Sequence, residues 1–307
     1  MSESEARNMK IERRTALGLL ASGLCPARAD ALEEQVIGRA QQGPGTVSLY
    51  AKNLETGRRI ELRSHERVRT ASTIKLPILA AVFAEVEAGN ACWDEPLPVT
   101  AREKVGGSGV LASEFSDGVQ LPLRDLAHLM IVLSDNTATN IILERFGPDR
   151  LNQHLENLGL TTTRILRKIR GNSEAFQSPH AFSKQGLLPA NQRFGIGVST
   201  PEEMGRLLEK LAYGQVVSRE ASAEMLGILK RCQDDTGIRR RLQGLTVANK
   251  TGALDHLRSD VALVEGPAGR IVMAITVDDI PQVDWSPDNT GSLLIAQLAE
   301  TLACHLA

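Results

Sequence analysis

The segment Ala71-Ser72-Thr73-Ile74-Lys75 places a serine three residues before a lysine, at the start of the apolar run 76–84. The run has the character of a buried helix. Residues three apart on a helix share a face, so we expect Lys75 to reach Ser72. A lysine held in an apolar wall loses solvation, which lowers its pKa and lets its amine accept a hydroxyl proton. The segment therefore predicts a serine nucleophile with a built-in base.

Two further observations bear on this serine and lysine. Pro77 removes a helix hydrogen bond, which indicates that the helix begins at or just before Ser72. The serine then lies at the positive end of the helix, where backbone N–H groups can face a developing anion. The same spacing also arises by chance about once in a chain of ordinary composition, as a surface pair near a helix start. The other motifs of the chain must therefore decide between a catalytic pair and a chance surface pair.

Composition bounds the class of protein. The chain has 307 residues, which suits one large domain or two small ones, and 42% are hydrophobic, which is enough for a sizeable core. A net charge of −2 and 3% aromatic residues indicate no nucleic-acid partner and no anionic membrane surface. Because the cysteines form no C-x-x-C pair and the histidines no H-E-x-x-H pattern, we expect no metal site, no disulfide framework and no cofactor.

The N-terminus has the layout of a secretory signal over residues 1–29. Arg13-Arg14-Thr15 precedes the short apolar run 16–21, and Ala27-Arg28-Ala29 offers a cleavage triplet. The paired arginines indicate the twin-arginine route, so we expect a secreted or periplasmic protein. An amphipathic start to a cytoplasmic helix is the alternative, and whether Cys25 carries a lipid stays open. No later stretch is long enough to span a membrane.

Periodicity predicts an α+β fold in which strands lie at both ends of the chain. We expect a five-stranded antiparallel sheet flanked by helices, plus an all-helical subdomain, with the site in the cleft between them. Residues 30–307 form a single domain, its α/β part at 30–65 and 215–307 and its helical part at 66–214. The expected strands are 46–51, 58–62, 245–250, 259–265 and 270–277. The expected helices are 30–42, 72–88, 123–133, 137–146, one from Thr200, 216–232 and 291–306.

Three segments of the middle region bear on the position of the functional site. Ser134-Asp135-Asn136 lies where one helix ends and the next begins, so Asp135 or Asn136 is a candidate helix cap as well as a site residue. The glycine-rich loop 105–111 lacks the lysine and the strand–helix context of a phosphate-binding loop, which argues against nucleotide binding. Residues 160–199 show little regular pattern, and a loop of this length usually indicates a functional flap.

Lys250-Thr251-Gly252 ends an edge-like strand and completes the set. A glycine there lets a ligand approach the backbone, while the lysine and threonine offer donors to a carboxylate. Ser72-x-x-Lys75, Ser134-Asp135-Asn136 and Lys250-Thr251-Gly252, in this order and on these elements, resemble the class A β-lactamases and their penicillin-binding relatives. The resemblance extends over residues 30–306.

The resemblance implies a role for each matching residue. Ser72 attacks the strained amide carbonyl and is acylated, Lys75 takes or relays its proton, and Ser134, bridged towards Lys250, protonates the leaving nitrogen. The residues implied in binding are Asn136 for a side-chain amide, Ala253 with Ser72 for the oxyanion, and Lys250, Thr251 and Gly252 for a carboxylate. Arg258 assists there, or is a solvated strand arginine. The implied partner is a small molecule, a β-lactam or a peptidoglycan stem peptide, and we expect a monomer.

One position departs from the family. Where the relatives carry Arg-x-x-Arg-x-Glu, this chain has Arg164-Ile165-Leu166-Arg167-Lys168-Ile169, so Ile169 replaces the glutamate that activates the deacylating water. Glu174 is the nearest downstream carboxylate and a candidate on position alone, although its residue type favours a surface glutamate. Glu114 is a second, weaker candidate. Without such a base the acyl-enzyme should persist. The resemblance therefore leaves three functions open: a β-lactamase with slow deacylation, a D-alanyl-D-alanine peptidase or esterase, and a binding domain that senses β-lactams or cell-wall fragments without turnover.

Overall fold

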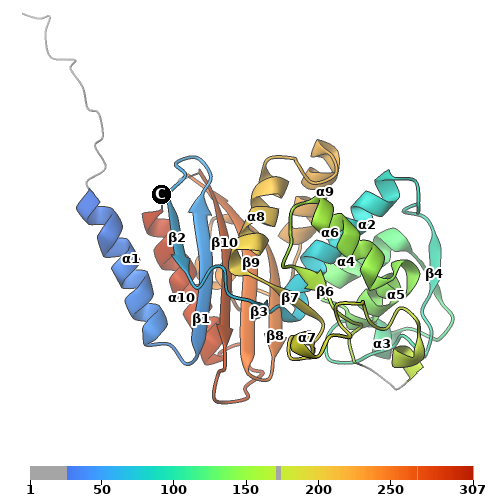
Figure 1. The fold of residues 1–307 in the computed structure, drawn as a ribbon. Helices are drawn as coiled ribbons and strands as arrows, with labels where there is room; N and C mark the ends of the chain where they lie inside the picture. The colour runs from blue at the N-terminus through green and yellow to red at the C-terminus, as the bar shows by residue number, and fades with distance from the viewer. Residues whose placement is uncertain (1–25, 171–173, 268, 307) are drawn as a thin grey trace, which may run out of the picture.

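The computed structural model describes residues 26–170, 174–267 and 269–306. Its centre is a five-stranded sheet in the order β2-β1-β10-β9-β8, with every neighbouring pair antiparallel (Figure 1). The strands are β1 (Thr46–Asn53), β2 (Arg59–Leu62), β8 (Thr246–Leu254), β9 (Leu257–Gly266) and β10 (Gly269–Asp278). The predicted fold class is confirmed, because the N-terminal hairpin and the last three strands, far apart in sequence, pair into one sheet.

Helices cover both faces of this sheet. Helices α1 (Pro26–Gln41) and α10 (Thr290–His305) pack on one face and α8 (Pro201–Ala212) on the other. On β10, Ile271, Met273 and Ile275 join the apolar cluster of α1 and α10, whereas Val272 and Ala274 join the cluster that continues into the helical region. Side chains alternate across a strand, so two covered faces require apolar residues at every position.

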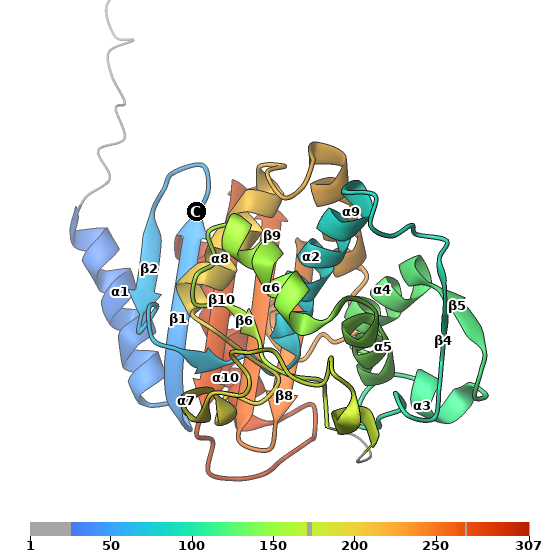
Figure 2. The ribbon, with the colours of Figure 1, turned by 45° about the vertical axis from the view of Figure 1, so that its right-hand side comes forward.

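The remaining helices lie beside the sheet (Figure 2), with α2 (Lys75–Glu87) at their centre. Helix α2 is buried at every position from Lys75 to Phe83, and most of these residues are apolar. Its buried Glu85 pairs with Arg150 and His154. The other helices and 3-10 turns are η1 (Ala71–Ile74), α3 (Leu111–Glu114), α4 (Leu123–Val132), α5 (Asn136–Phe146), α6 (Pro148–Asn157), η2 (Glu174–Gln177), α7 (Pro189–Gln192), α9 (Arg219–Lys230) and η3 (Ile238–Arg241). The division of the chain at 66 and 214 stays a prediction.

The structure corrects three expectations. The strand expected to end at Lys250 continues through Thr251 and Gly252 to Leu254, because Gly252 takes its place in the ladder opposite Ser259. Helix α6 was not predicted. The segment expected to lack pattern, 160–199, contributes β6 (Arg164–Ile165) and β7 (Gly197–Ser199), which pair with β3 (Val68–Arg69) in a small sheet. A further two-stranded sheet joins β4 (Pro96–Pro98) to β5 (Gln120–Pro122).

The N-terminal prediction falls largely outside the described residues. Helix α1 begins at Pro26, so the triplet Ala27-Arg28-Ala29 lies within it, whereas Arg13-Arg14 and Cys25 belong to the part that is not described. Among the described residues, none of the helices has both the length and the apolar character needed to cross a bilayer. The secretory signal therefore stays a prediction.

A buried charge cluster holds the segment that follows β6. The Lys168 side chain is fully buried, and its amine lies 2.8 Å from Glu103 Oε2 and 2.5 Å from Glu144 Oε2. Ser178 Oγ also donates to Glu144 Oε2. The carboxylates come from a turn and from α5, so the cluster fixes Lys168 and Ser178 to the helical region.

We expect Lys168→Met to lower the free energy of unfolding by about 3 kcal/mol, because it removes the buried cation and leaves Glu103 and Glu144 with the partly exposed Arg102 as their remaining ion-pair partner. Urea unfolding followed by circular dichroism measures the change. The matched control is Lys184→Met, which removes an exposed lysine of the same region and should change the value by less than about 0.5 kcal/mol. Equal losses in both variants would contradict the anchoring role.

Candidate active site

Ser72 lies on the turn that leads into α2. Residues Ala71–Ile74 form the 3-10 turn η1, which continues directly into the helix, so the predicted helix start is confirmed. Ala71 has φ +45°, a left-handed conformation that costs an L-residue about 1–2 kcal/mol. Ser72 itself is partly exposed while its neighbours Ala71 and Thr73 are buried. The turn therefore presents the serine hydroxyl at the surface of a cavity.

Lys75 is fully buried one turn beyond Ser72, and its amine faces the Ser134–Asn136 triplet. The amine donates to Ser134 O (2.6 Å), to Asn136 Oδ1 (2.8 Å) and to Ser134 Oγ (3.2 Å). Burial lowers the pKa of Lys75 well below its usual value, and the nearby charge of Lys250 lowers it further. Among the described residues no hydrogen bond joins Lys75 to the Ser72 hydroxyl, so direct proton transfer between them stays a prediction.

The Ser134–Asn136 triplet holds the glycine-rich loop against the site. Ser134 has φ +53°, and Asp135 caps α5 by accepting from Ala138 N, which confirms the expected cap. The other oxygen of Asp135 accepts from the backbone N–H groups of Val110 and Leu111 at 2.7 and 2.9 Å. Asn136 adds a bond from its amide to Gly106 O at 3.0 Å. The loop 105–111 is thus a wall of the site.

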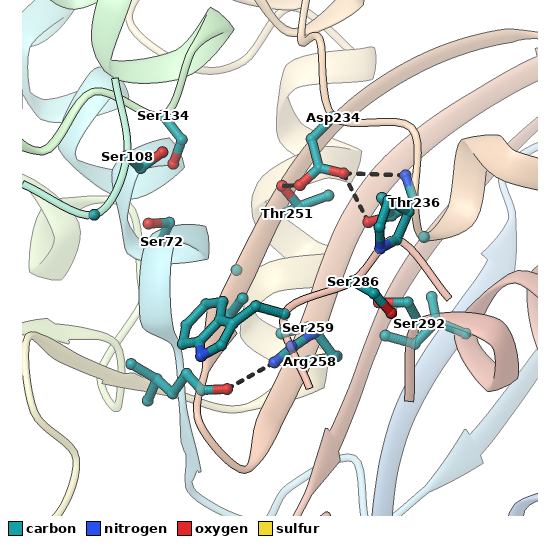
Figure 3. A pocket seen from close by; sticks show the side chains of 18 of the residues that line it. Ser72, Ser108, Ser134, Asp234, Thr236, Thr251, Arg258, Ser259, Ser286 and Ser292 are labelled. Carbon is teal, nitrogen blue, oxygen red and sulfur yellow. Dashed lines mark hydrogen bonds between the residues drawn. The ribbon is translucent and has the colours of Figure 1, made fainter. Parts of the chain in front are cut away.

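The edge strand β8 closes the other side. A Cβ on Gly252 would lie 2.7 Å from Thr70 O and 3.0 Å from Ser72 N, so only glycine lets the strand come this close to the serine turn. Between the two sides lies a cavity of about 450 Å³. Figure 3 shows Ser72 and Ser134 facing Thr251 across it. The predicted residues that line it are Ser72, Ser134, Asn136, Thr251, Gly252, Ala253 and Arg258.

Lys250 belongs to this strand, and its side chain is fully buried. Its amine donates to Thr251 O at 2.8 Å, and burial lowers its pKa against the opposing effect of the charges of Cys232, Asp234 and Asp260. No hydrogen bond joins it to Ser134 among the described residues, so the bridge that the resemblance implies stays a prediction. The charge of Lys250 nevertheless lies close enough to act on the amine of Lys75.

Arg258 is committed to the backbone around it. Its guanidinium donates to Leu254 O (2.6 Å) and Leu257 O (2.7 Å), and also to Asp284 O. It stacks 5.0 Å from the ring centroid of Trp285, whose side chain is 63% exposed and lines the cavity. Arg258 is therefore a buried, hydrogen-bonded residue of the cavity wall rather than a solvated strand arginine.

The backbone of Ile169 is bonded to Asn140, which lies one helical turn from Asn136 on α5. The side chain of Asn140 on α5 accepts from Ile169 N at 2.9 Å and donates to Ile169 O at 3.1 Å. Residues four apart on a helix share a face, so Asn140 and Asn136 lie on the same side of α5, and Asn140 holds the backbone of Ile169 there. Glu114 is exposed at the end of α3. Glu174 opens η2, but its side chain lies outside the described residues, so its role as a base stays a prediction.

Sequence reasoning missed several residues of the cavity. Asp234, Thr236, Ser108 and Trp285 line it, and Asp234 bonds directly to Thr251. The run Asp234-Asp235-Thr236-Gly237, a turn pattern just before a predicted strand, was the available signal for the first two. Among residues 26–170, 174–267 and 269–306, no group of three potential metal ligands comes together.

Comparisons with known proteins found similar sequences and similar folds. The sequence model of the beta-lactamase enzyme family matches residues 29–306. A beta-lactamase of Rhodobacter capsulatus is 27% identical over 263 residues, 82% of each chain. Among solved structures, a beta-lactamase from Sphaerobacter thermophilus has a TM-score of 0.74 and 27% identity, covering 92% of this chain and 98% of its own. The penicillin-G acyl-enzyme of a leucine-to-glutamate mutant of PBP-A has a TM-score of 0.73 and 28% identity, covering 89% and 95%.

Asp260, which is fully buried on β9 opposite Thr251, generates a prediction about pH. Burial raises the pKa of its carboxyl from 3.8 to about 7. Because the folded state then holds the proton more tightly than the unfolded state, the stabilisation is present below pH 4 and is lost as pH rises through about 7. Asp260→Asn should therefore gain about 2–4 kcal/mol relative to the wild type between pH 4 and pH 8. Urea unfolding at both pH values measures this, and a constant difference would contradict it.

Proposed function

Because the chain belongs to the beta-lactamase enzyme family, we propose that it opens the β-lactam amide through an acyl-enzyme on Ser72, as class A enzymes do. The observation that carries the proposal is the buried amine of Lys75, one turn from Ser72 and 3.2 Å from Ser134 Oγ. Burial lowers the pKa of this amine, which makes its uncharged form, the form that acts as a base, more accessible than in a free lysine.

Acylation uses this amine as a proton relay. The Ser72 hydroxyl gives its proton to the neutral amine of Lys75 while Oγ bonds to the carbonyl carbon. The C–N bond of the ring then breaks, and the proton passes through Ser134 Oγ to the leaving nitrogen. The contact between Lys75 and Ser134 supports this path, because it joins the base to the donor for the leaving group.

Backbone and side-chain donors bind the substrate. The N–H groups of Ser72 and Ala253 hold the oxyanion, where one donor typically contributes about 3 kcal/mol to transition-state stabilisation. The close approach of Gly252 to Ser72 N supports this pairing, since it brings the backbone of β8 next to the backbone of the serine turn. Asn136 orients the side-chain amide of the substrate, and its own amide is already positioned by Gly106 O.

Deacylation is the slow step in this proposal. A hydrolytic water needs a base beside the ester, and an isoleucine side chain cannot accept a proton. The resemblance assigns the glutamate position to Ile169, and the two hydrogen bonds between the Asn140 side chain and the backbone of Ile169 support a fixed backbone there. The penicillin-G acyl-enzyme of the PBP-A mutant supports covalent trapping in a chain of this fold.

The same observation favours a second candidate function. A D-alanyl-D-alanine peptidase or esterase uses the same serine machinery on a peptide and does not need the loop glutamate, and PBP-A at 28% identity is a relative with the same fold. A binding domain that is acylated without turnover is the limiting case. Under each candidate function the substrate is a small molecule. We propose that the protein is a class A-like monomer located in the periplasm or outside the cell.

We expect benzylpenicillin or a chromogenic cephalosporin to form a covalent adduct on Ser72 that lasts longer than the time needed to form it. Intact mass spectrometry followed by peptide mapping measures both the adduct and its position. Ser72→Ala removes the nucleophile and should give no adduct, while Ser108→Ala, on the facing loop, should still be acylated. An unmodified wild-type protein, or an adduct elsewhere, would rule out the mechanism.

We expect Ile169→Glu to speed deacylation at least tenfold, because it places a base beside the ester on a backbone that Asn140 already fixes. Single-turnover release of the penicilloyl group measures this rate separately from acylation. Ile169→Gln is the matched control, since it adds a side chain of the same size that cannot act as a base. If the wild type already releases product quickly, Glu174→Gln should trap the adduct; unchanged release would remove Glu174 from the mechanism.

A further inference from the structure

One of the two tryptophans of the chain is exposed at the active-site cavity. Trp285 lies between β10 and α10 and lines the same cavity as Ser72, yet it is 63% exposed. Trp93, by contrast, packs edge-on against Phe83, with the ring centroids 4.6 Å apart. Among the described residues that line the cavity, Trp285 is the single aromatic side chain. Ligand pockets are typically lined by aromatic surface, so this exposed ring indicates a contact for a ligand.

Hydrogen bonds on both sides of Trp285 fix its backbone. Asp284 O accepts from the guanidinium of Arg258 and from Asn289 Nδ2, the latter at 2.9 Å. The carboxylate of Asp284 accepts from Ser286 N at 2.8 Å and from Ser286 Oγ at 3.0 Å. The indole ring is therefore presented by an anchored turn, and little conformational entropy is lost when a ligand contacts it.

One face of the indole ring is already in contact with the protein. The guanidinium carbon of Arg258 lies over it, 5.0 Å from the ring centroid. A ring covered on both faces could not keep this much of its surface accessible, so the other face is open. A planar aromatic group fits such a face, because stacked rings gain a contact energy beyond the burial of apolar area.

The position of Trp285 along β8 indicates which part of a substrate would meet it. On this strand the proposed carboxylate contact, Thr251, precedes the oxyanion residue Ala253, and Leu254 follows it. Arg258 bonds to Leu254 O at 2.6 Å and stacks on Trp285, so Trp285 lies on the Leu254 side. In a β-lactam the ring carboxylate and the acyl side chain lie on opposite sides of the reacting carbonyl. The acyl side chain is therefore the part that extends towards Trp285.

We infer that Trp285 is a specificity-determining residue whose open face stacks on an aromatic ring in the acyl side chain of the substrate. The inference rests on the proposed acylation of Ser72 and names the kind of acyl group that this site prefers. Leu254 lines the cavity at the same end of β8 and adds apolar contact there.

The probes are benzylpenicillin and the penicillin with an acetyl side chain, which differ only by the phenyl ring. The measured quantity is the second-order rate constant of acylation for each, followed by intact mass spectrometry. In the wild type benzylpenicillin should react at least tenfold faster than the acetyl analogue. Equal rate constants for the two probes would overturn the inference without any variant.

Trp285→Leu keeps an apolar side chain but removes the flat ring, so it should lower the ratio of benzyl to acetyl rate constants about fivefold. Trp285→Phe keeps a smaller flat ring and should retain most of the ratio. Val283→Ala is the matched control, because Val283 is an exposed apolar residue of the same segment that is not part of the cavity lining, and it should leave the ratio unchanged.

Two results would contradict the inference in different ways. A ratio that Trp285→Leu leaves unaltered, even if both rate constants fall together, would show that Trp285 has only a structural role, and it would overturn the inference while acylation stands. No adduct with either probe in any of the proteins would instead reject the proposed function.

Discussion

The buried amine of Lys75 is the interaction on which the site depends. It comes from α2, at the centre of the helical region, and its three acceptors all belong to the Ser134–Asn136 triplet between α4 and α5. Burial of an amine is costly unless acceptors surround it, so the three hydrogen bonds both satisfy the buried amine and tie α2, which follows the turn of Ser72, to the triplet. Burial is the larger cause of the lowered pKa of Lys75, and the charge of Lys250 adds a contribution from the sheet.

Two glycines let the sides of the cavity come close together. Gly252 lets β8 approach Thr70 and Ser72, and a Cβ on Gly109 would lie 2.1 Å from Asp135 Oδ2. In each case the glycine stands where one side of the cavity meets another. The apolar clusters on the two faces of the sheet provide most of the stability, whereas the geometry of the cavity is set by close backbone approach and by a few buried polar bonds. A substitution at such a glycine would therefore change the shape of the site more than the fold.

The sequence predicted the fold and the three motifs, because strand alternation, helix caps and the Ser-x-x-Lys spacing are local patterns. It could not predict Asp234 as a site residue, since its contact with Thr251 depends on how a turn packs against a strand 17 positions later. The sequence argues against a phosphate-binding loop at 105–111, but it does not predict the hydrogen bonds to Asp135 and Asn136 that make this loop a wall of the cavity. Glycine usually interrupts a strand, so the sequence predicts a strand end at Lys250, yet the edge position of β8 tolerates Gly252. Long-range packing decided each of these cases.

The side chains at positions 75 and 169 illustrate two different kinds of dependence. Lys75 joins structural elements through its own amine, so its chemistry cannot be changed without changing the packing. Ile169 is held through its backbone N–H and C=O by Asn140, and the segment around it is held by Lys168 with Glu103 and Glu144. None of these contacts uses the side chain of residue 169. Under the proposed mechanism, the residue that acts in acylation is therefore also a structural contact, whereas the side chain at the position proposed for deacylation takes no part in the contacts that hold its backbone.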